Sequence, residues 1–260
     1  MNFKQKYGDW ALITGASSGI GKEFAKQLAQ RGLNVVLVAR RIDKLKQLAD
    51  EIVKNYNVQA KIVQADLTKP DFLTKIKEVT NDLEIGLLVS NAGMMYIGNY
   101  FDNTPENEIK MIDLNIKAPA ILTHYFGQQM IKRKRGGIIY TASMLGFMGT
   151  PYSSAYAGTK AHEIVKAEGL AYELKPNGVD VLVLNPGLTQ TEMTSKNDFS
   201  KMPMKLMKPE LVAKSAINAI GKRTMVTPGF MNNMMNWMSK HIMSRKMNTK
   251  MFGGFMKKTF

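Results

Sequence analysis

A glycine-rich turn between a short apolar run and a helical pattern constrains the fold of this chain more than any other feature. Residues 10–14, WALIT, form a mostly apolar run that is typical of a buried strand. The residues that follow include Gly15, Gly19 and Gly21, and from Ile20 onward apolar residues recur on one helical face. Glycines between a strand and a helix let the backbone approach a pyrophosphate, and the free N–H groups that begin the helix face the anion. The stretch therefore predicts a dinucleotide-binding turn; a merely tight strand-to-helix turn is the alternative.

Apolar runs alternate with helical patterns along the rest of the chain. The expected strands cover residues 35–39, 60–65, 86–90, 138–142, 179–184 and 224–227. The expected helices cover residues 43–56, 69–81, 105–131, a stretch ending near 174, and 210–220. This alternation predicts an α/β fold, a doubly wound parallel sheet (Rossmann fold) of about seven strands with helices on both faces. We assign residues 1–229 to this single domain and residues 230–260 to a basic, methionine-rich amphipathic extension.

Arg40 is the residue that bears on the choice of dinucleotide. It stands nineteen residues after Gly21, where dinucleotide folds place an acid that holds the adenosine ribose. A guanidinium at this position can grip a 2′-phosphate as a bidentate donor. The sequence therefore predicts NADP(H) in preference to NAD(H). The alternative is that Arg40 and Arg41 form a solvated charge pair at the end of a strand.

Pro119 predicts a kink in the helix expected over residues 105–131. A proline cannot donate to the carbonyl four residues back, and its ring pushes that carbonyl away. The residue four back is Asn115. We expect the Asn115 carbonyl to be free to bind water.

Tyr156 and Lys160 form the candidate catalytic pair. Residues four apart lie on the same face of a helix, one turn above each other. A phenol loses its proton near pH 10, and a neighbouring ammonium favours the phenolate and lowers that pKa. Such pairs also occur by chance on solvated helices, but here Ser143 precedes the tyrosine by thirteen residues and the glycine turn opens the chain.

These motifs, over residues 10–227, resemble the short-chain dehydrogenase/reductase (SDR) family in its shorter, single-domain form. The resemblance implies hydride transfer between a nicotinamide and a carbonyl carbon, with Tyr156 as the acid or base, Lys160 lowering its pKa and binding the nicotinamide ribose, and Ser143 holding the carbonyl oxygen. It also implies that Asn115 holds a water linking Lys160 to solvent. The matching motifs are the glycine turn, Asn91-Ala92-Gly93, Asn115, Ser143, Tyr156-x-x-x-Lys160 and Pro186-Gly187. The implied cofactor contacts are Gly15, Ser17, Ser18, Gly19, Ile20, Gly21, Arg40, Asp66, Leu67, Asn91, Ala92, Gly93, Tyr156, Lys160, Pro186, Gly187, Thr189 and Thr191.

The substrate is predicted to be a small, apolar carbonyl or alcohol. Residues 192–209 read as a mobile loop whose Met193, Phe199, Met202 and Met204 suggest an adaptable apolar lining. Met94 and Met95 belong either to the core or to the substrate wall, beside Ser143. The overall pattern resembles the branch that includes 3-oxoacyl and hydroxysteroid reductases, which implies reduction of a lipid-like ketone. Family members commonly pair through the helices that carry Asn115 and Tyr156, which implies a homodimer or homotetramer.

Composition excludes some classes of protein and leaves others open. With no cysteine and three separated histidines, the chain offers no disulfide framework and no ligand spacing, so we expect no metal. There is no signal peptide and no run of about eighteen apolar residues, so we expect a cytoplasmic protein. The alternatives to an enzyme are a non-catalytic dinucleotide-binding scaffold and a nucleic-acid-binding protein. The intact catalytic set argues against the first, and the lack of a recognised motif argues against the second.

The charge of the chain is concentrated toward its C-terminus. The net charge is +15, and no acidic residue follows Glu210. An apolar stripe at helical spacing occupies the same region, formed by Met231, Met234, Met235, Met238 and Ile242 with Trp237 at its edge. The stripe either packs on the domain or on a partner subunit, or forms an interfacial helix that rests on anionic lipid.

Overall fold

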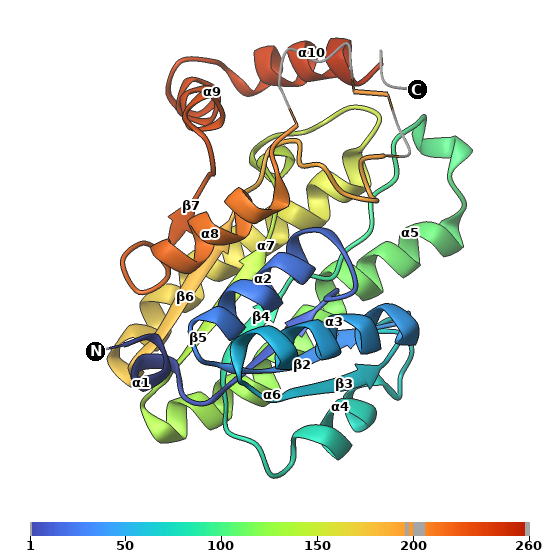
Figure 1. Cartoon of the computed structure of the whole chain (residues 1–260). Coiled ribbons are helices and arrows are strands. Elements are labelled where there is room, and N and C mark those ends of the chain that lie inside the picture. Colours follow the sequence, from blue (N-terminus) through green and yellow to red (C-terminus); the bar gives the residue numbers. More distant parts are fainter. Residues whose placement is uncertain (1, 196–197, 200–205, 258–260) are drawn as a thin grey trace.

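Seven parallel strands form one sheet at the centre of the protein (Figure 1). The computed structural model describes residues 2–195, 198–199 and 206–257. The strands are β1 (Trp10–Thr14), β2 (Asn34–Ala39), β3 (Ala60–Gln64), β4 (Ile85–Ser90), β5 (Gly136–Thr141), β6 (Val179–Leu184) and β7 (Met225–Val226). Their order across the sheet is β3-β2-β1-β4-β5-β6-β7. The predicted doubly wound parallel sheet is therefore confirmed.

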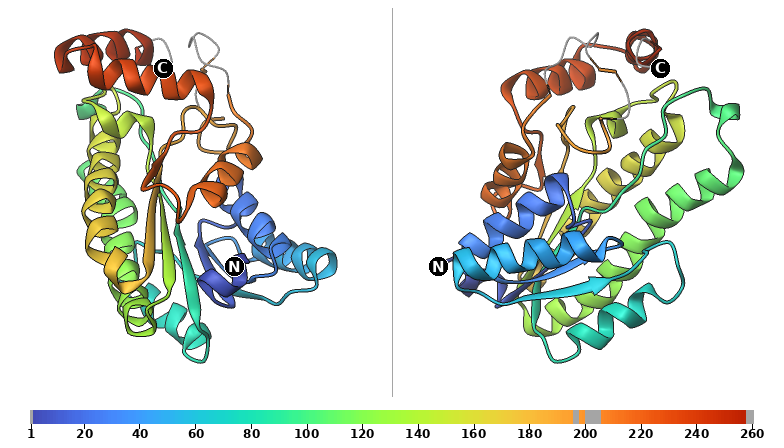
Figure 2. Two further views of the ribbon diagram at one scale, coloured as in Figure 1. Left: turned by 90° about the vertical axis from the view of Figure 1, so that its left-hand side faces the viewer. Right: turned by 45° about the vertical axis from the view of Figure 1, so that its right-hand side comes forward.

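Helices cover both faces of this sheet (Figure 2). The helices are α1 (Phe3–Tyr7), α2 (Gly19–Gln30), α3 (Ile42–Tyr56), α4 (Phe72–Thr80), α5 (Pro105–Ile112), α6 (Ala118–Arg133), α7 (Ser154–Leu174), α8 (Pro209–Ala219), α9 (Phe230–His241) and α10 (Arg245–Met256). One apolar cluster joins α2, α3 and α8 to the sheet, and a second joins α4, α6 and α7 to its other side. Strands buried on both faces read as continuous apolar runs, as β1, β4 and β5 do.

The strand order creates one place where a ligand fits across the sheet. β1 is an inner strand, and the chain leaves it first toward β2 and β3 and then returns to β4 on its other side. Connections on the two sides of this point leave an opening at the carboxyl ends of the strands. Gly15, Asn91, Ser143 and Asn185 follow the ends of four neighbouring strands. Residues distant in the sequence therefore meet at one edge of the sheet.

The long helix expected over residues 105–131 is interrupted, as Pro119 predicts. A single π-helical turn, Asp113–Lys117, separates α5 from α6, and Pro119 is the second residue of α6. Because the proline ring excludes the regular hydrogen bond to the carbonyl four residues back, the backbone widens just before it. Asn115 lies at the centre of the widened turn and is completely buried.

The C-terminal extension forms two helices with different surroundings. Asn232, on α9, is buried and donates to the Pro228 carbonyl at 2.7 Å, while Asn233 donates to the Thr227 carbonyl at 2.6 Å. The asparagine face of α9 therefore packs on the domain, and its apolar stripe lies on the outside. In α10, by contrast, apolar side chains pack on the domain, since Phe252 and Met256 are buried. No helix in the part of the chain that the structure describes is long and apolar enough to cross a membrane.

Candidate active site

The glycine turn is shaped by close backbone approaches. Gly15 and Gly19 have φ values of +67° and +55°, which favour glycine. A side chain at Gly21 would lie 2.3 Å from the Gly15 carbonyl oxygen, so this glycine allows α2 to begin tight against the turn. Gly21 lies beneath the turn rather than on the cavity wall. The N-terminus of α2 consequently opens toward the carboxyl edge of the sheet, where it can meet a pyrophosphate.

A cavity of about 710 Å³ runs along this edge from the glycine turn to α7. Among the described residues, every predicted cofactor, catalytic and substrate residue except Gly21 and Asn115 lines it. These lining residues are Gly15, Ser17, Ser18, Gly19, Ile20, Arg40, Asp66, Leu67, Asn91, Ala92, Gly93, Met94, Met95, Ser143, Tyr156, Lys160, Pro186, Gly187, Thr189, Thr191 and Met193. The cradle at Gly15 and Gly21 and the open helix terminus suit a dinucleotide.

The adenosine end of the cavity is basic, because Arg40 and Arg41 line it and Lys44 lies nearby. Arg40 lines the cavity as predicted, and with the hydrogen bonds from Thr68 its charge lowers the pKa of Asp66 against the opposing effect of burial. The neighbouring Arg41 makes the more definite contacts, donating to the hydroxyls of Ser17 and Ser18 at 2.9 and 2.8 Å. Arg41 is a residue that the sequence argument considered only as a surface charge.

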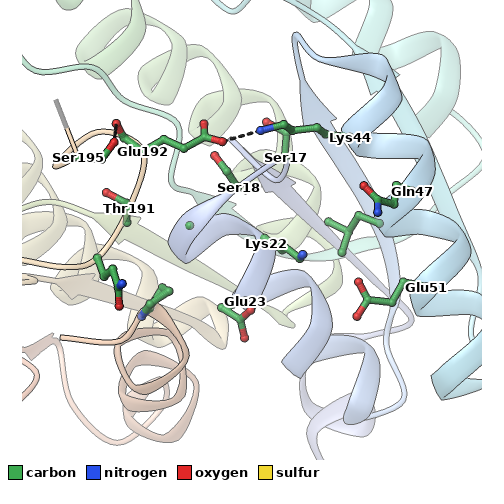
Figure 3. A pocket seen from close by; sticks show the side chains of 14 residues that line it. Ser17, Ser18, Lys22, Glu23, Lys44, Gln47, Glu51, Thr191, Glu192 and Ser195 are labelled. Carbon is green, nitrogen blue, oxygen red and sulfur yellow. Dashed lines mark hydrogen bonds and ion pairs between the residues drawn. The ribbon is translucent and has the colours of Figure 1, made fainter. Parts of the chain in front are cut away.

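Glu192 bridges the cations of this basic cluster. Its carboxylate accepts from Lys44 at 2.5 Å and from Arg41 at 2.6 Å, and Figure 3 shows Lys44 reaching it over the glycine turn. The hydrogen bond from Lys44, with burial opposing and Arg41 adding to it, lowers the pKa of Glu192 to about 2. Glu192 therefore partly neutralises the cations at this end of the cavity.

The Asn91-Ala92-Gly93 segment is held by Thr14 at the end of β1. The Thr14 hydroxyl accepts from the backbone N–H groups of Asn91 and Ala92 at 2.9 and 3.0 Å, and the Asn91 amide donates to the Thr14 carbonyl at 3.0 Å. A side chain at Gly93 would lie 3.3 Å from the Asn115 amide oxygen and 3.6 Å from Lys160 Nζ. The small residues thus keep a passage open between this part of the cavity and Lys160.

Asn115 acts through its side chain in this structure. Its amide oxygen accepts from the Met94 N–H, and its amide nitrogen donates to the Met94 carbonyl and the Thr159 hydroxyl, each at 3.0 Å. These bonds join the segment after β4 to α7. The sequence argument concerned only the Asn115 carbonyl, because the side chain's partners come from distant parts of the chain.

Ser143, Tyr156 and Lys160 meet at the deep end of the cavity. The Ser143 hydroxyl interacts with the Tyr156 phenol, and Lys160 Nζ lies 5.7 Å from the centre of the tyrosine ring. Lys160 Nζ also donates to the Thr141 carbonyl at 2.7 Å. Gly146 makes this convergence possible, since a side chain there would lie 2.7 Å from the Lys160 carbonyl carbon. The three side chains predicted to act together are therefore adjacent.

The environment pulls the tyrosine pKa in two directions. Burial raises the pKa of Tyr156 above its ordinary value, whereas the Lys160 charge and the Ser143 hydroxyl lower it. Burial is the larger effect, so the pKa of Tyr156 is raised overall. A residue that the sequence argument missed adds to this, because the buried carboxylate of Glu163 also favours the protonated phenol. Its spacing of seven residues from Tyr156 on the buried face of α7 is the signal that could have found it.

The wall of the cavity beyond the catalytic residues is apolar. Met94, Met95, Met193 and Phe199 line it, and Met202 and Met204 lie outside the described residues. Phe252 and Met256 of α10 also line it, which the sequence argument did not anticipate. Within the described ranges, no three or more His, Cys, Asp or Glu side chains gather in a way that could hold a metal.

This fold and site define a nucleotide-dependent oxidoreductase, and comparison with known proteins agrees. A family model described as short chain dehydrogenase matches residues 9–201, and the chain therefore belongs to the SDR family. A very-long-chain 3-oxoacyl-CoA reductase of Mus musculus is 33% identical over 256 residues, covering 97% of this chain and 81% of the relative.

Two solved structures share the architecture across almost the whole chain. One, described as giving structural and biochemical insights into 7β-hydroxysteroid dehydrogenase stereoselectivity, has a TM-score of 0.90 at 30% identity and covers 97% of this chain and 100% of its own. The other, a short-chain dehydrogenase from Sphingobium yanoikuyae in complex with NADPH, has a TM-score of 0.80 at 30% identity, with coverage of 91% and 96%.

Proposed function

We propose that this protein transfers a hydride between NADP(H) and a carbonyl or alcohol, and that it reduces an apolar, lipid-like ketone of the 3-oxoacyl or ketosteroid type. The observation that carries the proposal is the convergence of Ser143, Tyr156 and Lys160 at one end of a cavity whose other end is the glycine turn. The nicotinamide supplies or accepts the hydride when it is bound. All other steps belong to side chains of this chain.

Each catalytic side chain has a separate task in this proposal. Ser143 donates a hydrogen bond to the substrate oxygen and positions it beside the tyrosine hydroxyl. Tyr156 gives its proton to that oxygen as the carbon gains the hydride, and takes the proton back in the reverse reaction. Lys160 stabilises the phenolate that remains. Asn115 fixes the Met94 backbone at the side of the cavity and thereby keeps the passage to Lys160 open.

The basic cluster supports a preference for NADP(H) over NAD(H). Arg40 and Arg41 line the adenosine end, where the ribose 2′-phosphate of NADP(H) would add negative charge, and Lys44 lies beside them through its bond to Glu192. Ser17 and Ser18 already hold the Arg41 guanidinium in place. The Sphingobium neighbour binds NADPH, which agrees with this preference.

The shape and chemistry of the far wall support an apolar substrate. Met94, Met95 and Met193 line the cavity together with Phe252 and Met256, and none of these side chains is charged. Unbranched thioethers adapt to irregular apolar shapes. The names of the relatives, a 3-oxoacyl-CoA reductase and a 7β-hydroxysteroid dehydrogenase, are consistent with a lipid-like ketone.

The outer faces of α5 and α7 support a homodimer or homotetramer. Tyr172 and Val165 on α7 are 86% and 69% exposed, and Ile109 on α5 is also exposed. Residues 165 and 172 are seven apart and share one helical face. Pairing of two copies through this face would remove their apolar side chains from water.

The outer face of α9 supports reversible contact of a cytoplasmic protein with an anionic membrane. Phe230 and Trp237 are 83% and 56% exposed on a helix whose polar face is turned inward. The exposed cations nearby are Lys240, Arg245, Lys246 and Lys250, and no acidic residue accompanies them. Each cation close to an anionic surface contributes about 1 kcal/mol, and aromatic and methionine side chains enter the interface.

The proposed reaction is tested by replacing the acid alone. A panel of 3-oxoacyl thioesters, ketosteroids and small ketones is supplied with NADPH, and the best substrate is then used with Tyr156→Phe. We expect a loss of about 10²- to 10⁴-fold in kcat, with NADPH affinity within about twofold of wild type. Tyr172→Phe, an exposed tyrosine on the same helix, is the matched control and should leave kcat unchanged. Normal NADPH binding without reduction of any ketone would favour the scaffold alternative, and salt-sensitive DNA retention without turnover would favour nucleic-acid binding.

A further inference from the structure

A buried carboxylate lies directly behind the catalytic lysine. Glu163 is on α7, one turn beyond Lys160, and its Oε2 accepts a hydrogen bond from Lys160 Nζ at 2.7 Å. The two side chains are only 2% and 4% exposed. Among the ion pairs between described residues, no other has both partners so deeply buried. Burial of a charge is costly unless it is paired, so this contact is not a surface accident.

Glu163 restricts what the Lys160 ammonium can do. An ammonium has three N–H donors. In Lys160, one of them meets the Thr141 carbonyl and a second meets Glu163, both at 2.7 Å. One donor is left for the cavity that Lys160 lines. The carboxylate and the carbonyl together therefore fix the direction of the remaining donor.

Glu163 also offsets the charge that Tyr156 experiences. Lys160 favours the phenolate, whereas the negative charge of Glu163 favours the protonated phenol. The other ionisable groups that face Glu163 are Lys166 on α7 and Tyr140 on β5. Lys166 favours the ionised carboxylate, and the Tyr140 hydroxyl is engaged with Thr123 of α6 at 2.5 Å. Burial raises the pKa of Glu163 to about 7, so the carboxylate is ionised under alkaline conditions, where the phenol begins to lose its proton.

We propose that Glu163 is a positioning residue for the hydride-transfer reaction, which holds the Lys160 ammonium against the Thr141 carbonyl and offsets its charge on Tyr156. The inference rests on the proposed function, since it assigns Tyr156 as the proton donor. The working pH of the tyrosine is then determined by Lys160 and Glu163 together. The exposed Glu168 on the same helix has no such contact with Lys160 and serves as the matched control.

The test compares pH profiles of kcat/KM for ketone reduction and alcohol oxidation in wild type, Glu163→Gln and Glu168→Gln. Glutamine keeps an acceptor for Lys160 but removes the charge, so Lys160 would lower the tyrosine pKa further. In reduction the tyrosine must be protonated, so the fall of activity at high pH should begin at lower pH, by about one unit. In oxidation it must be ionised, so the rise of activity should also begin about one unit lower. Glu168→Gln should follow the wild-type profile in both directions.

The outcomes separate this inference from the proposed function. A merely structural loss lowers the height of both profiles without moving them. If Glu163→Gln is folded and its limbs coincide with those of wild type, Glu163 does not act on the tyrosine and the inference is wrong, while the reaction itself stands. If wild type and Glu168→Gln reduce no ketone, the proposed function fails first. Circular dichroism checks folding, and Glu163→Met, which fills the space without a charge, carries the same expectation if the glutamine variant does not fold.

Discussion

At the scale of single residues, the site depends on charges whose environments differ. Arg41 and Lys44 share an exposed carboxylate, whereas Lys160 shares a buried one. Exposed ion pairs are screened by solvent and exchange partners readily, while a buried pair is held by the cost of separating it. Arg41 and Lys44 can therefore exchange Glu192 for another anion, whereas Lys160 keeps Glu163.

The cofactor preference predicts which cations matter. Arg41→Ala removes the guanidinium held by Ser17 and Ser18, and we expect the Kd for NADPH to rise about tenfold or more with little change for NADH. Arg40→Ala should act in the same direction. Lys46→Ala, an exposed lysine on α3 with no place in the cavity wall, controls for net charge. Fluorescence titration measures the Kd of NADPH and of NADH for wild type and the three variants, and equal losses for NADPH and NADH would contradict a role in reading the 2′-phosphate.

The raised pKa of Glu163 predicts a stability difference that does not depend on any reaction. Its pKa is about 7 in the folded protein against 4.5 for the free side chain, so between these pH values the folded state binds more protons. The free energy of unfolding of wild type should therefore fall, relative to Glu163→Gln, as the pH rises from about 4.5 to about 7. Urea unfolding of both proteins across that interval measures the difference. Parallel curves would mean that Glu163 ionises normally, and Glu168→Gln should run parallel to wild type.

At the scale of elements, patterns of apolar residues predicted most of the fold. The inner strands are continuous apolar runs buried on both faces, and the sequence located them within a few residues. The effects of the glycine turn and of Pro119 are local, so they too could be predicted from the sequence alone. α1 was not predicted, because it is a five-residue helix whose order comes from Tyr7, which donates to Asp180 across 173 positions.

The parts of the site that escaped prediction depend on which way a side chain turns. Arg40 and Arg41 are adjacent and chemically identical, and only the fold shows that Arg41 reaches Ser17 and Ser18. In the sequence Glu163 is indistinguishable from a solvated glutamate, and only the structure shows that it is buried. Phe252 reaches the cavity from more than ninety residues beyond Tyr156, and no local pattern connects the two.

The interrupted helix predicts a test of how Asn115 is placed. Pro119→Ala restores a donor and lets the π-helical turn relax toward a regular helix, which would rotate Asn115 away from Met94 and Thr159. We expect lower kcat with little change in NADPH affinity, because the glycine turn is not disturbed. Pro105→Ala, at the exposed first position of α5, is the control and should keep the wild-type kcat. Unchanged kcat in Pro119→Ala would show that the break is dispensable.

At the scale of the whole molecule, two of the exposed apolar surfaces in the described part of the chain bear on how the protein associates. One lies on α7 with Val165 and Tyr172, and the other lies on α9 with Phe230 and Trp237. The sequence predicted the stripe on α9 but could not say which face of the helix would touch the domain. Asparagines at 232 and 233 decide this by bonding to the segment after β7.

A reciprocal pair of variants distinguishes the roles of these surfaces. Phe230→Gln with Trp237→Gln should abolish flotation with anionic vesicles at low salt and leave the sedimentation coefficient unchanged. Val165→Gln with Tyr172→Gln should lower the sedimentation coefficient toward that of a monomer and leave flotation unchanged. Neither variant should float with neutral vesicles, and neither should float with anionic vesicles at high salt. If the α9 variant dissociates the oligomer instead, the stripe is a subunit interface and the membrane proposal is wrong.

The origin of the cavity walls from distant parts of the chain has a practical consequence for redesign. The cofactor end is built from the turn after β1 and the residues that follow β2, while Phe252 and Met256 line the substrate end from α10. The segments that build the two ends share no residue. A library of variants that changes only α10 would therefore test ketones of different sizes while the nucleotide site stays unaltered. Selectivity for substrate and choice of coenzyme are in this sense separate modules that an engineer can exchange one at a time.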